Sequence, residues 1–253
     1  MKKATDFKIV ERRQYGEGFF GWTLACPDRL EPVRAGQFVE VEVKGVSDVM
    51  LRRPISIHDF DVTGGTLKLL VQIVGKGTRM LATLREGDSV NLVYPLGNGF
   101  AVEGERPLLV GGGAGVAPLL ALAKAYKAKG VVPHILLGGR SESLLPARDV
   151  FDKAGILHLA TEDGSLGEKG LVTQHSVFAG QYDHIACCGP TPMMKAVARS
   201  AHERAVTCEV SLENLMACGL GACLCCVCDT VEGHKCVCKD GPVFDSRRLR
   251  DFV

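Results

Sequence analysis

Hydrophobic and polar positions divide the chain into two regions with different periods. Up to about residue 100, short runs of β-type residues alternate with turn residues, which is typical of strands with one buried face. Six such runs at close spacing predict an antiparallel barrel or sandwich, and they occupy residues 7–15, 19–26, 36–43, 52–60, 67–74 and 89–96. A helix-like segment at residues 78–84 interrupts them, and its start offers free backbone N–H groups and the positive end of a dipole.

From about residue 106 the pattern changes, because apolar strands now alternate with helical segments. We expect strands within 107–113, 132–139, 156–163 and 184–190, and helices at 116–130, 146–155 and 191–205. Alternation of this kind predicts a parallel sheet of the doubly wound type. This region is expected to end near Val206.

The remaining tail contains few large apolar side chains, so it is not expected to fold around a core of its own. Something else must hold it in place. The pattern therefore predicts three domains: a β-barrel over residues 1–101, an α/β domain over 102–207 and a small cysteine-rich domain over 208–253.

Composition excludes several classes of protein. Thirty basic and 29 acidic residues give a net charge of +1 without a basic block, which argues against nucleic acid as a partner. No apolar run approaches the roughly 18–20 residues needed to cross a bilayer. An odd number of cysteines, 11, and a start without an apolar leader favour a reduced, cytoplasmic compartment over a secreted disulfide framework.

Seven of the cysteines lie within the 21 residues from Cys218 to Cys238. The spacing Cys218-x4-Cys223-x2-Cys226, followed by Cys238, matches the plant-type ferredoxin pattern for a [2Fe–2S] cluster. A zinc site with four cysteine ligands is the alternative, although zinc ribbons usually have two C-x2-C pairs. Cys225-x2-Cys228 is a second, overlapping C-x2-C pair, so the spacing leaves open which four cysteines bind the cluster. We interpret the three additional cysteines, Cys225, Cys228 and Cys236, as packing residues.

A glycine-rich turn follows the first strand of the α/β region and opens a helix. The sequence GGGAGVAP at 111–118 contains Gly113-x-Gly115-x-x-Pro118, with proline where a dinucleotide fingerprint has its third glycine. Proline suits the first turn of a helix. An ordinary tight turn is the alternative interpretation, but it rarely uses four glycines in five residues.

Three features together resemble the ferredoxin reductase superfamily: this G-x-G-x-x-P turn, Cys188-Gly189-Pro190 at the end of a strand, and Arg53-Pro54-Ile55-Ser56 in the barrel region. The resemblance implies a barrel that binds a flavin and an α/β domain that binds a nicotinamide dinucleotide. It implies the following cofactor-binding residues: Arg53, Pro54, Ile55, Ser56, Leu70, Val71, Gln72, Gly77, Thr78, Gly111, Gly113, Gly115, Cys188, Gly189 and Pro190.

Physical roles can be given to the main members of this set. Arg53 offers a planar fork to the flavin pyrophosphate, although an arginine taken alone is more often a surface ion-pair partner. Ser56 is placed to hydrogen-bond the flavin N5, residues 70–72 would supply backbone contacts, and Gly77 and Thr78 would hold phosphate at a helix start. Cys188 would lie beside the nicotinamide, whereas a lone cysteine there would be a packing residue.

The choice between NAD and NADP depends on the end of the strand at 156–163. Glu162 and Asp163 would repel a 2′-phosphate, so the sequence favours NAD. Arg140, just after the preceding strand, weakens this inference.

Over its whole length the chain is similar to one family within the superfamily, the electron transfer subunits of NAD-dependent dihydroorotate dehydrogenases. The resemblance implies FAD, a [2Fe–2S] cluster on Cys218, Cys223, Cys226 and Cys238, and NAD. It also implies an FMN-containing catalytic subunit as partner, in a heterotetramer of two plus two that serves pyrimidine (UMP) biosynthesis. The segments that carry it are LRRPISI (51–57), VGKGT (74–78), GGGAGVAP (111–118), CCGPTPMM (187–194), SLENLMACGLGACLCCVC (211–228) and VCKDGPVFD (237–245).

The implied order of electron transfer is FMN in the partner, the cluster, FAD, and then NAD+, because a flavin exchanges both hydride and single electrons. No catalytic acid or base is expected in this chain. We expect the partner to dock on the exposed face of the cluster tail, including residues near Asp240 to Phe244. Two alternatives are the NAD(P)H-oxidising subunit of a sulfhydrogenase or ferredoxin-dependent transhydrogenase, and a zinc-stapled module that binds nucleotides without redox chemistry.

Overall fold

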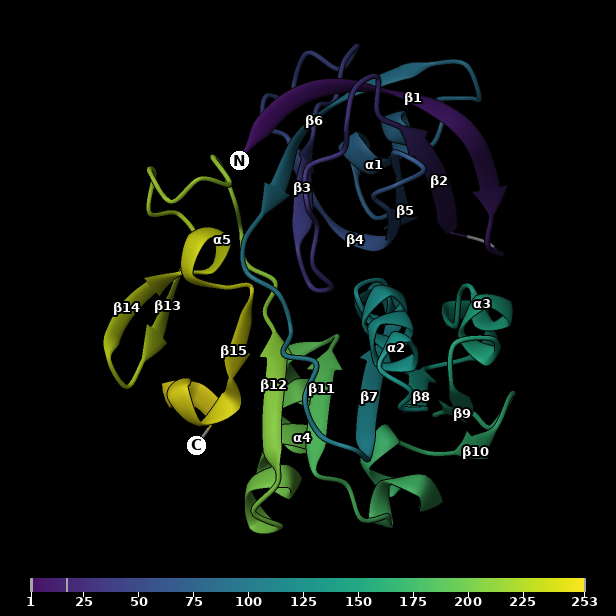
Figure 1. The fold of residues 1–253 in the computed structure, drawn as a ribbon, viewed down its shortest axis with the longest axis vertical. Helices are drawn as coiled ribbons and strands as arrows, with labels where there is room; N and C mark the ends of the chain where they lie inside the picture. The colour runs from purple at the N-terminus through teal and green to yellow at the C-terminus, as the bar shows by residue number, and fades with distance from the viewer. Residues whose placement is uncertain (1, 17, 253) are drawn as a thin grey trace.

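The computed structural model describes residues 2–16 and 18–252, so the outermost limits expected for the domains, residues 1 and 253, lie outside the described residues. The first region forms a closed antiparallel barrel with the strand order β1-β2-β5-β4-β3-β6 (Figure 1). One short helix, α1 (Lys76–Leu81), lies between β5 and β6. The strands are β1 (Lys3–Gln14), β2 (Phe19–Ala25), β3 (Phe38–Val41), β4 (Arg53–Asp61), β5 (Thr66–Gln72) and β6 (Ser89–Leu96).

The barrel closes because its strands place apolar residues on the inner face. In β6 every second residue from Val90 to Leu96 is buried, as period-two alternation requires. Phe7 and Tyr94 meet edge to face inside the barrel, with ring centroids 4.9 Å apart, and Trp22 is buried in the same cluster. The predicted barrel is therefore confirmed.

The second region forms a sheet of seven strands in the order β10-β9-β8-β7-β11-β12-β15, parallel except for the last pair. Neighbouring residues of β7 enter separate buried clusters, since Leu108 and Val110 pack with residues of α4 and Leu109 packs with residues of α2. Helices thus cover both faces, and the predicted doubly wound fold is confirmed. The elements are β7 (Pro107–Gly112), α2 (Leu119–Ala128), β8 (His134–Gly139), α3 (Arg148–Asp152), β9 (Ile156–Thr161), β10 (Glu168–Lys169), β11 (His184–Cys188), α4 (Thr191–Glu203), β12 (Thr207–Ser211) and β15 (Val243–Asp245).

Two helices are shorter than expected. Within the segment 116–130 only Leu119–Ala128 forms a helix, α2, with Pro118 at its N-cap, and Val116 ends the 3-10 turn that precedes it. The segment 146–155 gives only α3, because Ala147 before it has φ 58°, a left-handed conformation that does not continue a helix. The 3-10 turns are η1 (Gly113–Val116), η2 (Glu142–Leu144), η3 (Val172–Gln174), η4 (Ser176–Ala179), η5 (Ser246–Arg248) and η6 (Arg250–Phe252).

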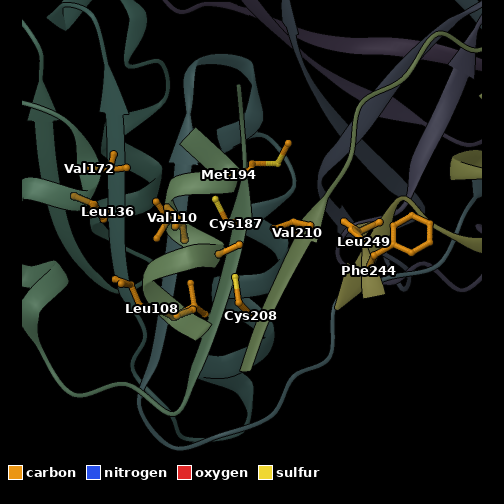
Figure 2. Close-up of a cluster of buried hydrophobic side chains, with 14 of the residues drawn as sticks. Leu108, Val110, Leu136, Val172, Cys187, Met194, Cys208, Val210, Phe244 and Leu249 are labelled. Carbon is orange, nitrogen blue, oxygen red and sulfur yellow. The ribbon is translucent and has the colours of Figure 1, made fainter. Parts of the chain in front are cut away.

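The tail forms a hairpin of β13 (Val227–Thr230) and β14 (Gly233–Cys236), one helical turn, α5 (Val237–Asp240), and then β15. It shares a buried cluster with the α/β domain, since Phe244 and Leu249 lie beside Val210 of β12, with Cys187 and Val110 deeper in the same cluster (Figure 2). β15 also adds to the sheet edge by antiparallel pairing with β12. Packing therefore contributes to holding the tail, in addition to any metal.

The division into three domains stays a prediction. Strand β12 crosses the last expected boundary, because it begins at Thr207 and belongs to the sheet as far as Ser211. Over residues 2–16 and 18–252, no helix combines the length and apolar character needed to span a membrane.

Candidate functional site

The predicted flavin residues Arg53, Pro54, Ile55 and Ser56 form the start of β4, where none of them is fully buried. This segment pairs antiparallel with β3, so that Ser56 lies opposite Phe38 and Arg53 lies opposite Val41. A strand start with accessible side chains is a suitable position for groups that must bind a ligand.

Arg53 crosses the barrel surface to the first turn of α1. A Cβ added to Gly77 would lie 2.7 Å from Nε of Arg53, so the guanidinium group lies directly against the backbone of Gly77. Arg53 Nη1 donates to the carbonyls of Leu51 and Arg52, both at 3.1 Å. Thr78 Oγ1 accepts from the N–H groups of Val74 and Gly75. A guanidinium beside a helix start suits the doubly charged pyrophosphate of a flavin dinucleotide.

The other predicted flavin residues, Leu70, Val71 and Gln72, end strand β5. Leu70 belongs to one buried cluster with Val116 and Ala117, the residues that end the glycine-rich turn. This end of β5 therefore lies at the joint between the barrel and the α/β domain.

His58 fixes the same joint, and sequence reasoning missed it. Its Nδ1–H donates to the carbonyl of Ala117 at 2.8 Å. The ring is only 3% exposed, and burial lowers the pKa of His58 to about 4. No sequence signal distinguishes this histidine, because it occupies a polar position of an alternating strand.

The glycine-rich turn packs closely against the end of β11. A Cβ on Gly115 would lie 2.5 Å from the carbonyl carbon of Cys188, whereas a Cβ on Gly113 would meet no atom within 4 Å. Gly111 lies inside β7 and gives room to Leu119. The turn thus combines one crowded face with one open face, which is the arrangement a backbone needs to approach a phosphate.

Cys188 ends β11, and Gly189 and Pro190 lead into α4. Cys188 is 1% exposed, and burial raises the pKa of its thiol well above the usual range, so the thiol is neutral. Sequence-distant β7 and β11 are adjacent and parallel, with Cys188 opposite Gly111. The structure therefore brings together the two predicted nicotinamide segments.

Glu162 and Asp163 follow β9, two strands away from the glycine-rich turn in the sheet order. Both are exposed. Asp163 accepts hydrogen bonds from the hydroxyl and N–H of Ser165, which lower the pKa of its carboxyl. Arg140 is also exposed, so acidic and basic side chains both remain available at this edge.

The four predicted cluster cysteines form two pairs. The thiol of Cys218 lies close to that of Cys223, and the thiol of Cys238 lies close to that of Cys226. Within the described residues no three His, Cys, Asp or Glu side chains converge on a single metal ion. A [2Fe–2S] cluster needs two thiolate sulfurs on each iron, which two pairs of cysteines can supply. The donor set fits the cluster.

Backbone N–H groups approach these sulfurs. The N–H of Leu220 donates to Cys218 Sγ at 3.3 Å, and this bond, followed by one from the Cys223 N–H, lowers the pKa of Cys218 to about 6. Cys238 donates its N–H to Cys226 Sγ at 3.4 Å. Gly219 (φ 66°) and Gly221 (φ 83°) make this loop possible, because both lie in the left-handed region that favours glycine.

The three additional cysteines differ from one another. Cys225 is exposed, Cys228 lies in β13 opposite Lys235, and Cys236 is buried in the cluster shared with the α/β domain. Burial raises the pKa of Cys228 to about 11. Cys226, by contrast, is buried against Cys238, so its position favours it over Cys225 as a ligand.

The cysteine loop contacts the barrel, and Asn98 fixes the chain beyond it. A Cβ on Gly219 would lie 2.7 Å from Cγ of Glu40. Asn98, between β6 and β7, donates from Nδ2 to the carbonyls of Asp240 (3.1 Å) and Val243 (2.8 Å) and accepts from the N–H of Val243 (3.0 Å). Sequence reasoning missed both Glu40 and Asn98, since neither belongs to a recognisable motif.

The expected docking surface was the exposed face of the tail, and its inclusion of residues 241–244 is wrong. Gly241, Pro242, Val243 and Phe244 are buried, because β15 joins the sheet and the preceding turn packs on the barrel linker. Of the four large apolar side chains exposed in the described part of the tail, three lie in or beside the cysteine loop, namely Leu215 (82%), Leu220 (45%) and Leu224 (63%), and Val231 (54%) lies between β13 and β14.

A flavin-type barrel joined to a doubly wound domain, with paired cysteines between them, defines an electron-transferring reductase of the ferredoxin reductase type. Solved structures agree. The chain resembles the structure titled "Insights into flavin-based electron bifurcation via the NADH-dependent reduced ferredoxin-NADP oxidoreductase structure", with a TM-score of 0.86, 32% identity and coverage of 96% of this chain and 89% of that one. It shares its fold with a ferredoxin reductase in carbazole 1,9a-dioxygenase (TM-score 0.67, 19% identity, covering 81% of this chain and 67% of that chain).

Curated relatives identify the family. The electron transfer subunit of dihydroorotate dehydrogenase B (NAD+) from Lysinibacillus sphaericus is 39% identical over 96% of this chain and 97% of its own length. That from Caldanaerobacter subterraneus subsp. tengcongensis is 43% identical over 83% of this chain and 84% of its own. Residues 213–250 match the family model described as the iron-sulfur cluster binding domain of dihydroorotate dehydrogenase B. The chain belongs to the family of electron transfer subunits of dihydroorotate dehydrogenase B.

Proposed function

We propose that this chain transfers electrons from a dihydroorotate-oxidising catalytic subunit to NAD+. It uses FAD on the barrel, NAD on the glycine-rich turn and a [2Fe–2S] cluster on Cys218, Cys223, Cys226 and Cys238. The observation that carries the proposal is that the three proposed binding regions all contact the same barrel. The cysteine loop contacts β3, and the flavin segment on β4 pairs with β3. The glycine-rich turn packs against β5.

The flavin, when bound, exchanges hydride with nicotinamide and single electrons with the cluster. The protein's own residues would bind the flavin and the nicotinamide dinucleotide and orient them. Arg53 and Gly77 would receive the pyrophosphate, and Ser56, on the accessible start of β4, would donate to the flavin ring. The buried, neutral thiol of Cys188 and the open position at Gly113 leave space for the nicotinamide and its phosphates.

The partner is an FMN-containing catalytic subunit, and the assembly is a heterotetramer of two plus two. We place its docking surface at the exposed leucines Leu215, Leu220 and Leu224. Exposed apolar side chains grouped around a functional loop mark an interaction surface, and docking there would bring a second redox centre close to the cluster.

The test begins with the purified full chain. Its visible spectrum, flavin content and iron content are expected to show one FAD and one [2Fe–2S] cluster per chain, with NADH reducing an artificial two-electron acceptor. Co-expression with a dihydroorotate-oxidising subunit is expected to give a stable complex that reduces NAD+ with dihydroorotate.

A cluster-deficient variant separates the two half-reactions. Cys226→Ser is expected to retain the NADH-dependent reaction, which needs only the flavin, and to lose the dihydroorotate-dependent one. A chain that carries neither flavin nor iron would contradict the proposal. Co-purification with a hydrogenase subunit, without dihydroorotate activity, would favour the sulfhydrogenase alternative.

A further inference from the structure

Glu40 is a carboxyl group in an unusual position. It lies on β3, is 1% exposed, and both of its carboxyl oxygens lack a hydrogen-bond partner among the described residues. Burying a carboxyl without a partner costs stability, so an unpartnered buried group calls for an explanation.

The side chain of Glu40 lies under the cysteine loop. A Cβ on Gly219 would be 2.7 Å from Cγ and 3.0 Å from Oε1 of Glu40, and 3.2 Å from Cδ1 of Leu96. Gly219 is the residue next to Cys218. In the β3–β4 pair Glu40 lies opposite Pro54, and the next residue of β3, Val41, lies opposite Arg53. Glu40 therefore lies between the proposed flavin segment and the proposed cluster.

The nearest cations are bound elsewhere. Arg52 donates to the main-chain carbonyl of Glu40 (3.3 Å) and to Oδ1 of Asn91 (2.7 Å), and Arg53 donates to main-chain carbonyls. Neither guanidinium hydrogen-bonds the Glu40 carboxyl. Burial, opposed by Arg52 and reinforced by Cys218, raises the pKa of Glu40 to about 7.

We propose that Glu40 is a potential-setting residue: its negative charge, held under the Cys218 loop, disfavours the electron on the cluster and so favours its onward transfer to the flavin. The inference rests on the proposed function. Reduction adds one electron and one negative charge to the cluster without forming or breaking a bond. A like charge at short range in a poorly solvated site raises the energy of that reduced state.

The test measures the reduction potentials of the cluster and of the flavin in the full, cofactor-loaded chain. Measurement at about pH 9 favours the ionised form of the Glu40 carboxyl. Glu40→Gln, which removes the charge and keeps the shape, is expected to shift the cluster's reduction equilibrium about tenfold toward the reduced state, or 59 mV for a one-electron couple. The flavin potential is expected to move less.

Three further variants sharpen the test. Glu42→Gln removes the same charge two residues away, where Lys44 (3.2 Å) and Arg52 (3.9 Å) partner it, and is expected to shift the equilibrium less than about twofold. Glu40→Leu is a second variant that removes the charge and has a similar volume. It is expected to show the same shift, and it replaces Glu40→Gln in the test if Glu40→Gln folds poorly. Glu40→Asp keeps the charge and is expected to stay near the unsubstituted chain.

An unchanged cluster potential in Glu40→Gln or Glu40→Leu, with normal iron content, would overturn the inference and leave the proposed function intact. An equal shift in Glu40→Asp would overturn it as well, because the role would then be steric. Absence of a [2Fe–2S] cluster from the unsubstituted chain would overturn both.

Discussion

The barrel and the cysteine loop are in contact, yet they are stabilised in different ways. The barrel has its own apolar interior, in which Phe7, Trp22 and Tyr94 are at most 2% exposed. The loop between β12 and β13 has no regular secondary structure and leaves Leu215 82% exposed. The barrel is therefore expected to keep its structure independently of its neighbours, whereas the loop depends on the surfaces around it and on the metal that its sulfurs bind.

The largest effect is expected where the loop depends on its ligands. Cys226→Ser removes a buried thiol paired with Cys238, so we expect loss of most of the bound iron and of the cluster's visible absorption. Cys225→Ser changes an exposed thiol and is expected to leave iron content unchanged. If Cys225→Ser lost its iron and Cys226→Ser kept it, Cys225 would be the cluster ligand in place of Cys226. Hydrogen exchange should quicken over residues 213–226 and remain slow in the barrel.

The barrel is expected to respond most to loss of its interior packing. Phe7→Ala removes a fully buried ring that meets Tyr94, and it should cost about 3–5 kcal/mol of unfolding free energy. Leu215→Ala in the loop should change it by less than about 0.5 kcal/mol. Urea unfolding followed by the fluorescence of Trp22, the single tryptophan, measures both. Equal losses in the two variants would contradict the difference drawn between barrel and loop.

Acid is expected to weaken the joint between the barrel and the α/β domain. The unfolded chain protonates His58 near pH 6.5, but the folded chain does so only near pH 4. The contribution of His58 to stability is therefore complete above about pH 6.5 and is lost as the pH falls toward 4, by about 3 kcal/mol. In unfolding measured across this range, His58→Gln should flatten the dependence. An unaltered slope in His58→Gln would assign the acid sensitivity to other groups.

A smaller effect is expected at the clamp between the barrel linker and the tail. Asn98→Ala removes the side-chain hydrogen bonds to Asp240 and Val243, which should cost about 2 kcal/mol, or roughly thirtyfold faster exchange of amides at 237–249. Asn98→Asp keeps an acceptor for the N–H of Val243 but loses the amide donor. Its exchange rates should therefore lie between those of the unsubstituted chain and those of Asn98→Ala. Exchange that quickens equally in the barrel would mean that Asn98 supports the whole fold and not the tail.

Much of the fold could be predicted from sequence because its periodicities are local. Alternation in segments such as 89–96 predicts a strand with one buried face, and the turn at 111–118 predicts a strand followed by a helix. The cysteine spacing likewise predicts a cluster, since thiolates near one another along a loop can reach the same metal centre. The start of the helix within the segment 146–155 could not be predicted in this way, because Ala147 adopts a left-handed conformation that its residue type does not suggest.

The sequence by itself thus determined the barrel pattern, the doubly wound alternation and the cysteine set. Only the tertiary structure decided what covers each surface. Glu40 occupies a polar position in an alternating strand and would face solvent, but the tail folds back and buries it under Gly219. The segment 241–244 has the appearance of an exposed loop in sequence, yet it becomes buried because β12 offers it an open sheet edge. Contacts of this kind join residues far apart along the chain, so no local pattern encodes them.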